Sequence, residues 1–178
     1  AKPAAPVVSL AKNEVGYLNL MKLNSCLYID KAGALPQVTL EELERFSAGV
    51  ICLTGGSDGP LGRMILAGHL PKARALVQRL AAAYPDSLYV ELQRHPGEGG
   101  ALPEGEAASE SAMVDLAYDM GLPLVATNDV YFPKTEMYLA HDAMICISEG
   151  AYVDQSQPRR RLTPQHYFKT EAEMATLF

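Results

Sequence analysis

Positive charge is in short supply in this sequence. Among its 178 residues, Lys and Arg number 15 and Asp and Glu number 21, which gives a formal net charge of -6. A chain that binds nucleic acid through its phosphates normally has an excess of Lys and Arg, because these side chains replace condensed counterions. The balance therefore argues against a segment that holds a DNA duplex by itself.

Cysteine is also scarce. The three cysteines, Cys26, Cys52 and Cys146, are odd in number and far apart, and no two of them form a CxxC pair. These features exclude a disulfide framework and a paired-cysteine zinc site. Cys52 and Cys146 lie in apolar runs, so both are predicted to be small buried residues of a protein in a reducing cytoplasm.

Long apolar runs are missing as well. No stretch approaches the ~20 residues that a membrane span requires, and no signal peptide opens the chain. The first residue is Ala1 rather than Met, and residues 1–6 form an Ala- and Pro-rich run typical of a loop. We expect a segment from the interior of a longer protein, with no membrane contact.

Three short and nearly continuous apolar runs predict parallel strands that are covered on both faces, at residues 50–54, 88–92 and 124–127. Helical patterns fill the gaps between them, at residues 13–28, from Thr39 onward, at 71–83, 104–120 and 134–148, and from Thr170 onward. Glu42 and Glu173 each follow a Thr by three residues, which is the signature of a capping box.

This alternation of strands and helices predicts an α/β fold with a parallel sheet or barrel. Three strands are fewer than the roughly eight strand–helix units of a closed barrel. We therefore expect residues 1–178 to form a single domain that is part of a barrel.

In parallel α/β folds, functional groups gather beyond the carboxyl ends of the strands. Residues 54–63, after the first predicted strand, contain four glycines and two hydroxyl side chains. Their backbone amides could hold an anion, or the segment could be an ordinary tight turn. The tight turn is favoured, because the lysine and spacing of a P-loop are missing.

His95 and Asp129 follow the second and third predicted strands. A histidine at a strand end can be a metal ligand or a general base, although a lone loop histidine is more often a solvated surface residue. Asp129 can bind a metal, or it can cap the helix predicted at 134–148. These alternatives stay open at this point.

Two other polar groups have less specific patterns. His141 and Asp142 lie within the helix predicted at 134–148, where a polar helix face is the favoured interpretation. The basic run Arg159 to Arg161 could contact a phosphate backbone, but a solvated turn is favoured.

Several segments resemble the PHP domain of the alpha subunits of bacterial replicative DNA polymerases, the family C or DNA polymerase III enzymes. The similarity extends in order along nearly the whole chain, and it is carried by residues 16–20, 88–95, 121–130, 140–143 and 164–178. The run Pro123 to Asp129 and the tail that begins at Pro164 are its more specific parts.

The resemblance implies part of a distorted (βα)7 barrel of the PHP type, without the polymerase palm, fingers and thumb. In active members, histidines and carboxylates hold a cluster of Zn, Mn or Fe ions that hydrolyses phosphoesters. His95 and Asp129 match two of these ligand positions. Tyr131 stands where the family has a histidine, and a phenol is a poor substitute for imidazole at neutral pH.

The favoured hypothesis is a catalytically decayed PHP segment that needs no cofactor. It would support the rest of the alpha subunit in the bacterial cytoplasm and dock the proofreading exonuclease subunit. Contact with DNA would be made by other parts of the parent polymerase. The alternatives are a metal-dependent phosphoesterase with 3′–5′ exonuclease activity and, less favoured, a free-standing phosphatase of the same superfamily.

Overall fold

A computed structural model of the chain describes residues 4–29 and 36–178, apart from the side chain of Glu98. Residues 1–3, the first part of the expected opening loop, lie outside the described residues. The chain divides into two compact units, the first comprising Ala1–Leu92 and Ala108–Val125 and the second comprising Gln93–Ala107 and Ala126–Phe178. The expectation of a single domain over 1–178 stays a prediction.

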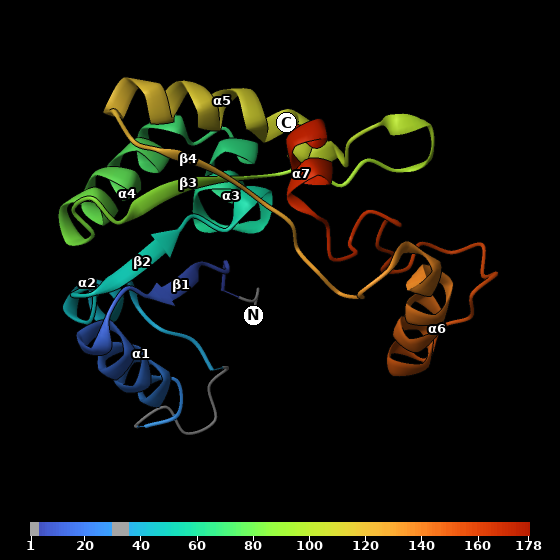
Figure 1. Cartoon of the computed structure of the whole chain (residues 1–178), viewed down its shortest axis with the longest axis horizontal. Coiled ribbons are helices and arrows are strands. Elements are labelled where there is room, and N and C mark those ends of the chain that lie inside the picture. The colour runs from blue at the N-terminus through green and yellow to red at the C-terminus, as the bar shows by residue number, and fades with distance from the viewer. Residues whose placement is uncertain (1–3, 30–35) are drawn as a thin grey trace. The chain divides into compact units, whose positions relative to one another are not determined.

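The first unit is built around a four-stranded sheet (Figure 1). The strands lie side by side in chain order: β1 (Val8–Ala11), β2 (Val50–Leu53), β3 (Leu88–Gln93) and β4 (Leu124–Thr127). β2 and β3 are parallel, with Cys52 opposite Leu88. The alternation of strands with helices and this parallel pairing confirm the predicted α/β fold.

The two edges of the sheet differ from the prediction. β1 was not predicted, and it pairs antiparallel with β2, so that Ser9 lies opposite Cys52. Its four residues are mostly exposed, so the strand is defined by pairing with β2 rather than by an apolar pattern of its own. β4 was predicted to be buried, but it lies at the other edge, with Leu124 exposed and Val125 only half-buried.

Six helical elements belong wholly or mainly to the first unit: α1 (Glu14–Cys26), α2 (Leu40–Arg45), η1 (Gly56–Asp58), α3 (Pro60–Leu66), α4 (Leu70–Ala83) and α5 (Glu104–Met120). The predicted capping box of α2 is present, since Thr39 and Glu42 each bond the other's backbone amide. Gly121 ends α5 with a φ of 63°, a left-handed conformation that glycine adopts without steric cost. The helices predicted at 13–28, 71–83 and 104–120 are therefore confirmed.

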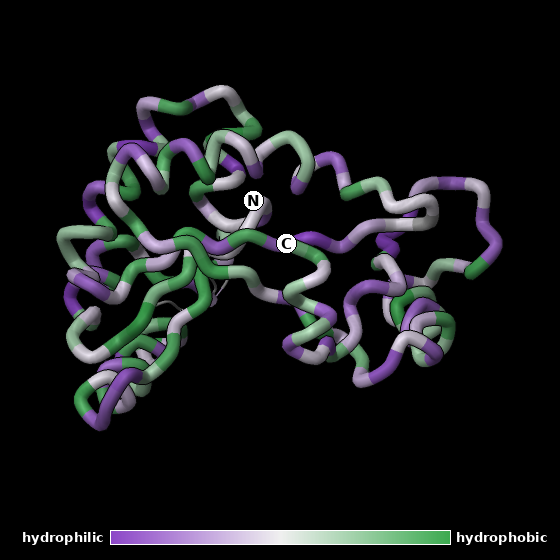
Figure 2. Tube along the Cα trace, turned by 45° about the horizontal axis from the view of Figure 1, so that its top comes forward, coloured by the Kyte–Doolittle hydropathy of each residue, from purple (hydrophilic) through white to green (hydrophobic). Residues whose placement is uncertain are grey.

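The core of the first unit lies between β2 and β3 and helices α3, α4 and α5. In Figure 2, green segments of the trace mark the apolar residues of the chain. The fully buried residues of this core include Cys52, Leu61, Val77, Val90 and Ala117. Burial of side chains of this kind removes apolar surface from water and is the main source of stability for the unit.

Gly16 allows α1 to approach the turn that precedes β2. A Cβ atom at this position would lie 1.7 Å from the carbonyl oxygen of Gly49, which no side chain could tolerate. The side chain of Asn13 caps α1 by accepting a hydrogen bond from the Gly16 amide at 3.0 Å. The glycine of the Gly16–Leu20 segment is therefore required by packing.

The second unit contains little regular structure. Beyond the ends of β3 and β4 and the first turn of α5, it holds η2 (Glu98–Gly100), η3 (Thr135–Met137), α6 (Tyr138–Glu149) and α7 (Glu171–Leu177). The helix predicted at 134–148 thus appears as η3 followed by α6. The predicted capping box at Thr170 and Glu173 is present at the start of α7. None of the helices described in either unit is long and apolar enough to cross a membrane.

Candidate functional site

The glycine-rich segment after β2 forms η1 and the start of α3 rather than an anion cradle. The Gly55 amide donates a hydrogen bond of 2.7 Å to the Glu91 carboxylate, which is buried. The Glu91 amide in turn donates to the Thr54 hydroxyl at 2.9 Å. A buried carboxylate at this place would repel a phosphate, so the favoured interpretation as a structural turn agrees with the structure.

His95 lies just past the end of β3 in the second unit, and it is buried rather than solvated, with 1% of its surface exposed. Glu106, in the first turn of α5, holds it from one side. The Glu106 carboxylate accepts hydrogen bonds from the His95 amide at 2.8 Å and from the His95 Nδ1 at 2.7 Å. This pairing of a carboxylate with an imidazole is typical of histidines that bind metals through the other nitrogen.

The other nitrogen of His95 is already in use. Its Nε2 accepts a hydrogen bond of 3.2 Å from the backbone amide of Asp129. Because a backbone amide can only donate, Nε2 carries no proton and the proton of the neutral ring lies on Nδ1, facing Glu106. Both nitrogens of His95 are therefore engaged by groups of the protein itself.

His166, in the loop before α7, completes this arrangement. Its ring stacks on that of His95, with centroids 3.9 Å apart and an interplanar angle of 6°. Its Nδ1 donates to the carbonyl oxygen of Asp129 at 2.9 Å. Burial, together with the neighbouring His95, lowers the pKa of His166. We call His95, Glu106, Asp129 and His166 the histidine cluster.

Asp129 keeps its carboxylate at the surface, facing Tyr131. Burial and the charge of Asp129 raise the pKa of the Tyr131 phenol, while Arg160 opposes the shift. The guanidinium of Arg160 also lies over the Tyr131 ring, at 5.9 Å from its centroid. Asp129 does not cap the helix predicted at 134–148, because Lys134 and Met137 precede η3 and α6.

The donor set does not fit the metal cluster that the resemblance to PHP domains implies. Nε2 of His95 and Nδ1 of His166 are taken up by the backbone of Asp129, and Tyr131 offers a phenol in place of an imidazole. Within residues 4–29 and 36–178, no three His, Cys, Asp or Glu side chains converge as metal ligands would. His95 and Asp129 do lie next to each other, but they meet through the backbone amide of Asp129.

Sequence reasoning singled out neither Glu106 nor His166 as a site residue. Glu106 lies in an acidic first helical turn, which is common because carboxylates are favoured at helix N-termini. His166 was noted only as part of the tail that carries the resemblance. No local pattern indicates that either side chain reaches His95.

His141 lies on α6 beside two aromatic rings. The ring centroids of Tyr131 and Phe132 are each 5.5 Å from that of His141. Its Nδ1 is the buried side-chain atom without a hydrogen-bond partner among the residues that the structure describes. This one nitrogen would need further ligands from other residues to form a metal site.

Asp142 and Arg159 form a buried ion pair in the second unit. Both carboxylate oxygens of Asp142 accept hydrogen bonds of 2.7 Å from the guanidinium of Arg159. Hydrogen bonds from Arg159 lower the pKa of Asp142 and outweigh the opposing effect of its burial. The prediction of a solvated turn at Arg159 to Arg161 is therefore wrong for Arg159. Its side chain instead links its loop to α6.

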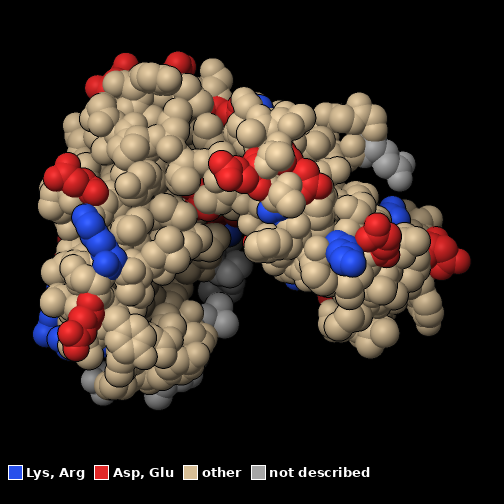
Figure 3. All heavy atoms as spheres, viewed as in Figure 1, with Lys and Arg blue, Asp and Glu red and all other residues tan. Residues whose placement is uncertain are grey.

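Charged side chains are dispersed over one face of the protein. On the face drawn in Figure 3, the described Lys and Arg side chains lie singly or in small groups among acidic ones and form no continuous basic surface. This distribution agrees with the acidic net charge of -6. It offers no electrostatic track for a DNA backbone on this face.

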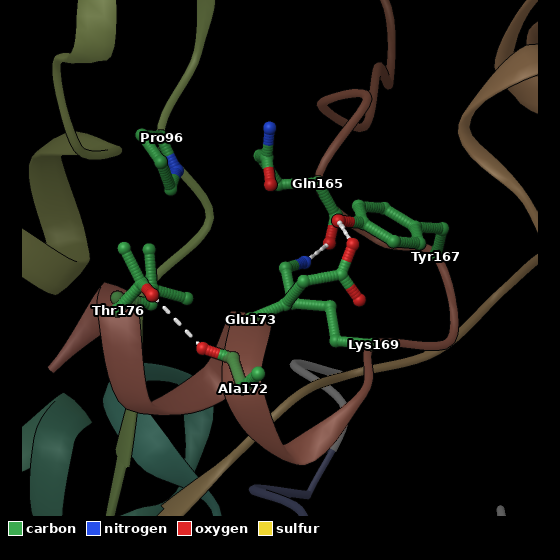
Figure 4. A pocket seen from close by; sticks show the side chains of 8 residues that line it. Pro96, Gln165, Tyr167, Lys169, Ala172, Glu173 and Thr176 are labelled. Atoms are coloured by element: carbon green, nitrogen blue, oxygen red, sulfur yellow. Dashed lines mark hydrogen bonds between the residues drawn. The ribbon is translucent and has the colours of Figure 1, made fainter.

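A pocket of about 440 Å³ lies in the second unit beside α7 (Figure 4). Its two charged side chains already have partners. Glu173 accepts hydrogen bonds from the Thr170 amide and the Tyr167 hydroxyl, and Lys169 donates to the Asn128 side chain and the Gln165 carbonyl. The polar groups of this pocket therefore serve the local fold.

Two curated proteins that are similar to this chain bear the same name. The chain is 47% identical over 177 residues to the DNA polymerase III subunit alpha of Caulobacter vibrioides, a match that covers 98% of this chain and 15% of the relative. It is 36% identical over 176 residues to the protein of that name from Rickettsia prowazekii, with 98% of this chain and 14% of the relative covered. The chain thus spans about one seventh of the length of these relatives.

A comparison with protein-family profiles gives a second match. The sequence profile described as "PHP domain" matches residues 2–95, which is more than half of the chain. The matched region contains β1, β2 and β3 and ends at His95. The chain therefore belongs to the PHP domain family.

Proposed function

We propose that this chain is the PHP segment of a bacterial replicative DNA polymerase alpha subunit and that it acts as a catalytically decayed scaffold. In the full-length protein, a DNA-directed DNA polymerase of the cytoplasm, it supports the polymerase domains and docks the proofreading exonuclease subunit. Its four-stranded sheet is part of a distorted (βα)7 barrel. Contact with DNA belongs to other parts of the polymerase.

The observation that carries the proposal is that the histidine cluster is already hydrogen-bonded to the backbone of Asp129. A metal ligand must present an unprotonated nitrogen or a carboxylate to the ion. Nε2 of His95 is unprotonated, but its lone pair already accepts a backbone hydrogen bond, and by the resemblance to PHP domains Tyr131 stands where PHP enzymes have an imidazole. The similarity to DNA polymerase III alpha subunits supports the polymerase part of the proposal.

A second candidate is a metal-dependent phosphoesterase with 3′–5′ exonuclease activity, and two observations favour it. Glu106 orients His95 as a carboxylate orients a metal-binding histidine, and His141 has an unpaired buried nitrogen. Clustered Zn, Mn or Fe ions would supply an activated water and neutralise charge on the phosphate. Residues beyond this chain would have to contribute further ligands.

Metal analysis of the full-length protein distinguishes the two candidates. The protein is purified without chelator and analysed for zinc, manganese and iron beside a Tyr131→His variant. We expect less than one equivalent of bound metal in the unmodified protein. Two or more tightly bound ions, together with exonuclease activity that a chelator abolishes, would establish the phosphoesterase and reject the scaffold. Metal in the variant alone would identify Tyr131 as the substitution that silenced the site.

A further inference from the structure

The backbone of Asp129 is held on both sides by imidazole rings. His95 Nε2 accepts a hydrogen bond from its amide at 3.2 Å, and His166 Nδ1 donates one to its carbonyl oxygen at 2.9 Å. The two rings stack on each other almost in parallel. The backbone of Asp129 is thus hydrogen-bonded to two side chains, and these two side chains stack on each other.

We propose that the stacked pair of His95 and His166 takes over the structural role of a metal ion at this site, and that His166 is the positioning residue for Asp129. The inference rests on the proposed function, since it assumes that the cluster holds no metal. It goes beyond that function because it names the groups that keep the decayed site folded.

The pair connects segments that are distant in the sequence. His95 follows β3, Glu106 lies in the first turn of α5, Asp129 follows β4, and His166 precedes α7. A bound ion holds segments of this kind together by drawing one ligand from each of them. Here the same segments are joined by hydrogen bonds whose donors and acceptors all belong to the protein.

The position of His166 is fixed by a second set of contacts. The Tyr131 amide donates to the His166 carbonyl at 2.9 Å, and the Phe168 amide donates to the Phe132 carbonyl at 3.0 Å. Phe132 and Tyr167 form an isolated parallel bridge. The loop before α7 therefore runs beside residues 131–132, and this pairing directs the His166 ring toward His95.

An imidazole suits this position better than other polar side chains. Nδ1 supplies the donor that the Asp129 carbonyl requires, and the flat ring covers the face of His95, which is buried. An alanine would leave the Asp129 carbonyl without this donor and would expose the face of the His95 ring. A glutamine could replace the donor but would cover the ring less completely.

Hydrogen–deuterium exchange of the full-length protein, read by mass spectrometry, tests the inference. His166→Ala is compared with the unmodified protein and with His69→Ala, which changes an exposed histidine of the first unit. Each protein is measured with and without chelator. We expect exchange about five-fold faster in peptides that cover 93–96 and 127–132 in His166→Ala, from the loss of one net hydrogen bond. We expect no change in His69→Ala, and none in the unmodified protein on adding chelator.

The possible outcomes separate this inference from the proposed function. Unchanged exchange in His166→Ala would overturn the role of His166 while the scaffold proposal stands. Faster exchange of the unmodified protein after chelation would show a structural metal and would overturn both. If His166→Ala unfolds the whole protein, peptides of α4 also exchange faster, and His166→Gln then decides. Intermediate protection in that variant supports the stacked pair, and full protection overturns it.

Discussion

Cys52 and Cys26 differ in how much of each side chain the fold covers. Cys52 lies fully buried in β2, and Cys26 is partly exposed at the end of α1. Burial, reinforced by the negative charge of Glu91, raises the pKa of the Cys52 thiol to about 12. Since the thiolate is the reactive form, the fold should make Cys52 inert near neutral pH.

Alkylation with iodoacetamide tests this difference. At a pH of about 8, we expect Cys26 to react readily, while roughly one Cys52 thiol in ten thousand is ionised, from the gap between this pH and a pKa of about 12. Peptide mass spectrometry identifies the labelled sites. Labelling in denaturant, where both cysteines should react, is the control. Equal rates for the two cysteines in the folded protein would contradict the buried position of Cys52.

The histidine cluster shows what a sequence can predict at the scale of single residues. The place of His95 past a strand end was predicted from the order of elements, and only the resemblance to PHP domains put it in one site with Asp129. Its burial and its partners Glu106 and His166 were not predicted, because these contacts depend on how distant loops meet. Local patterns carry no information about such contacts.

At the scale of elements, the ion pair of Asp142 and Arg159 ties α6 to the loop that follows it. The Asp142 side chain is 1% exposed and the Arg159 side chain 7% exposed, so the pair is shielded from water. Removing one partner of a buried pair leaves an uncompensated charge. We expect Arg159→Ala to lower the free energy of unfolding of this unit, and by clearly more than the loss of an exposed partner would.

Urea unfolding followed by far-ultraviolet circular dichroism measures the effect, and Arg161→Ala is the matched control. Arg161 lies 3.8 Å from the same carboxylate, but its side chain is 57% exposed. An exposed partner of this kind contributes about 0–1 kcal/mol. Similar losses in the two variants would mean that the buried pair has no special role.

The ion pair of Asp142 and Arg159 should also make the free energy of unfolding depend on pH. Because the pKa of Asp142 is lower in the folded chain than its ordinary value of 3.8, the pair stabilises the fold at pH values above that value. The contribution falls as pH decreases from about 3.8 through the lower folded pKa. The difference in stability between the unmodified chain and Arg159→Ala should therefore shrink in acid.

Elements with strong local signals were predicted well. The capping boxes at Thr39 and Thr170 set two helix starts, and the apolar runs from Val50 and Leu88 set two strands. β1 escaped prediction because its residues have no distinct pattern and depend on pairing with β2. The exposure of β4 could not be predicted either, since an apolar run does not tell an edge strand from a central one.

At the scale of the whole molecule, α6 carries an unusual distribution of side chains. Its buried residues are Asp142, Ile145 and Cys146, while Leu139, Met144 and Ile147 are exposed, Ile147 to 82%. Contiguous apolar surface of this kind promotes association in water.

We therefore expect the isolated chain to self-associate through α6 as its concentration rises. Sedimentation velocity over a range of concentrations measures the effect. Ile147→Glu should shift the chain toward the monomer, because a charge at the centre of the face would have to be desolvated on association. Tyr118→Glu is the matched control, since Tyr118 on α5 is 77% exposed and lies next to the exposed Asp119. If Tyr118→Glu dissociates the oligomer into monomers and Ile147→Glu does not, the contact between copies lies on α5. If the unmodified chain stays monomeric at every concentration, the α6 face is too small to hold two copies together without a larger partner surface.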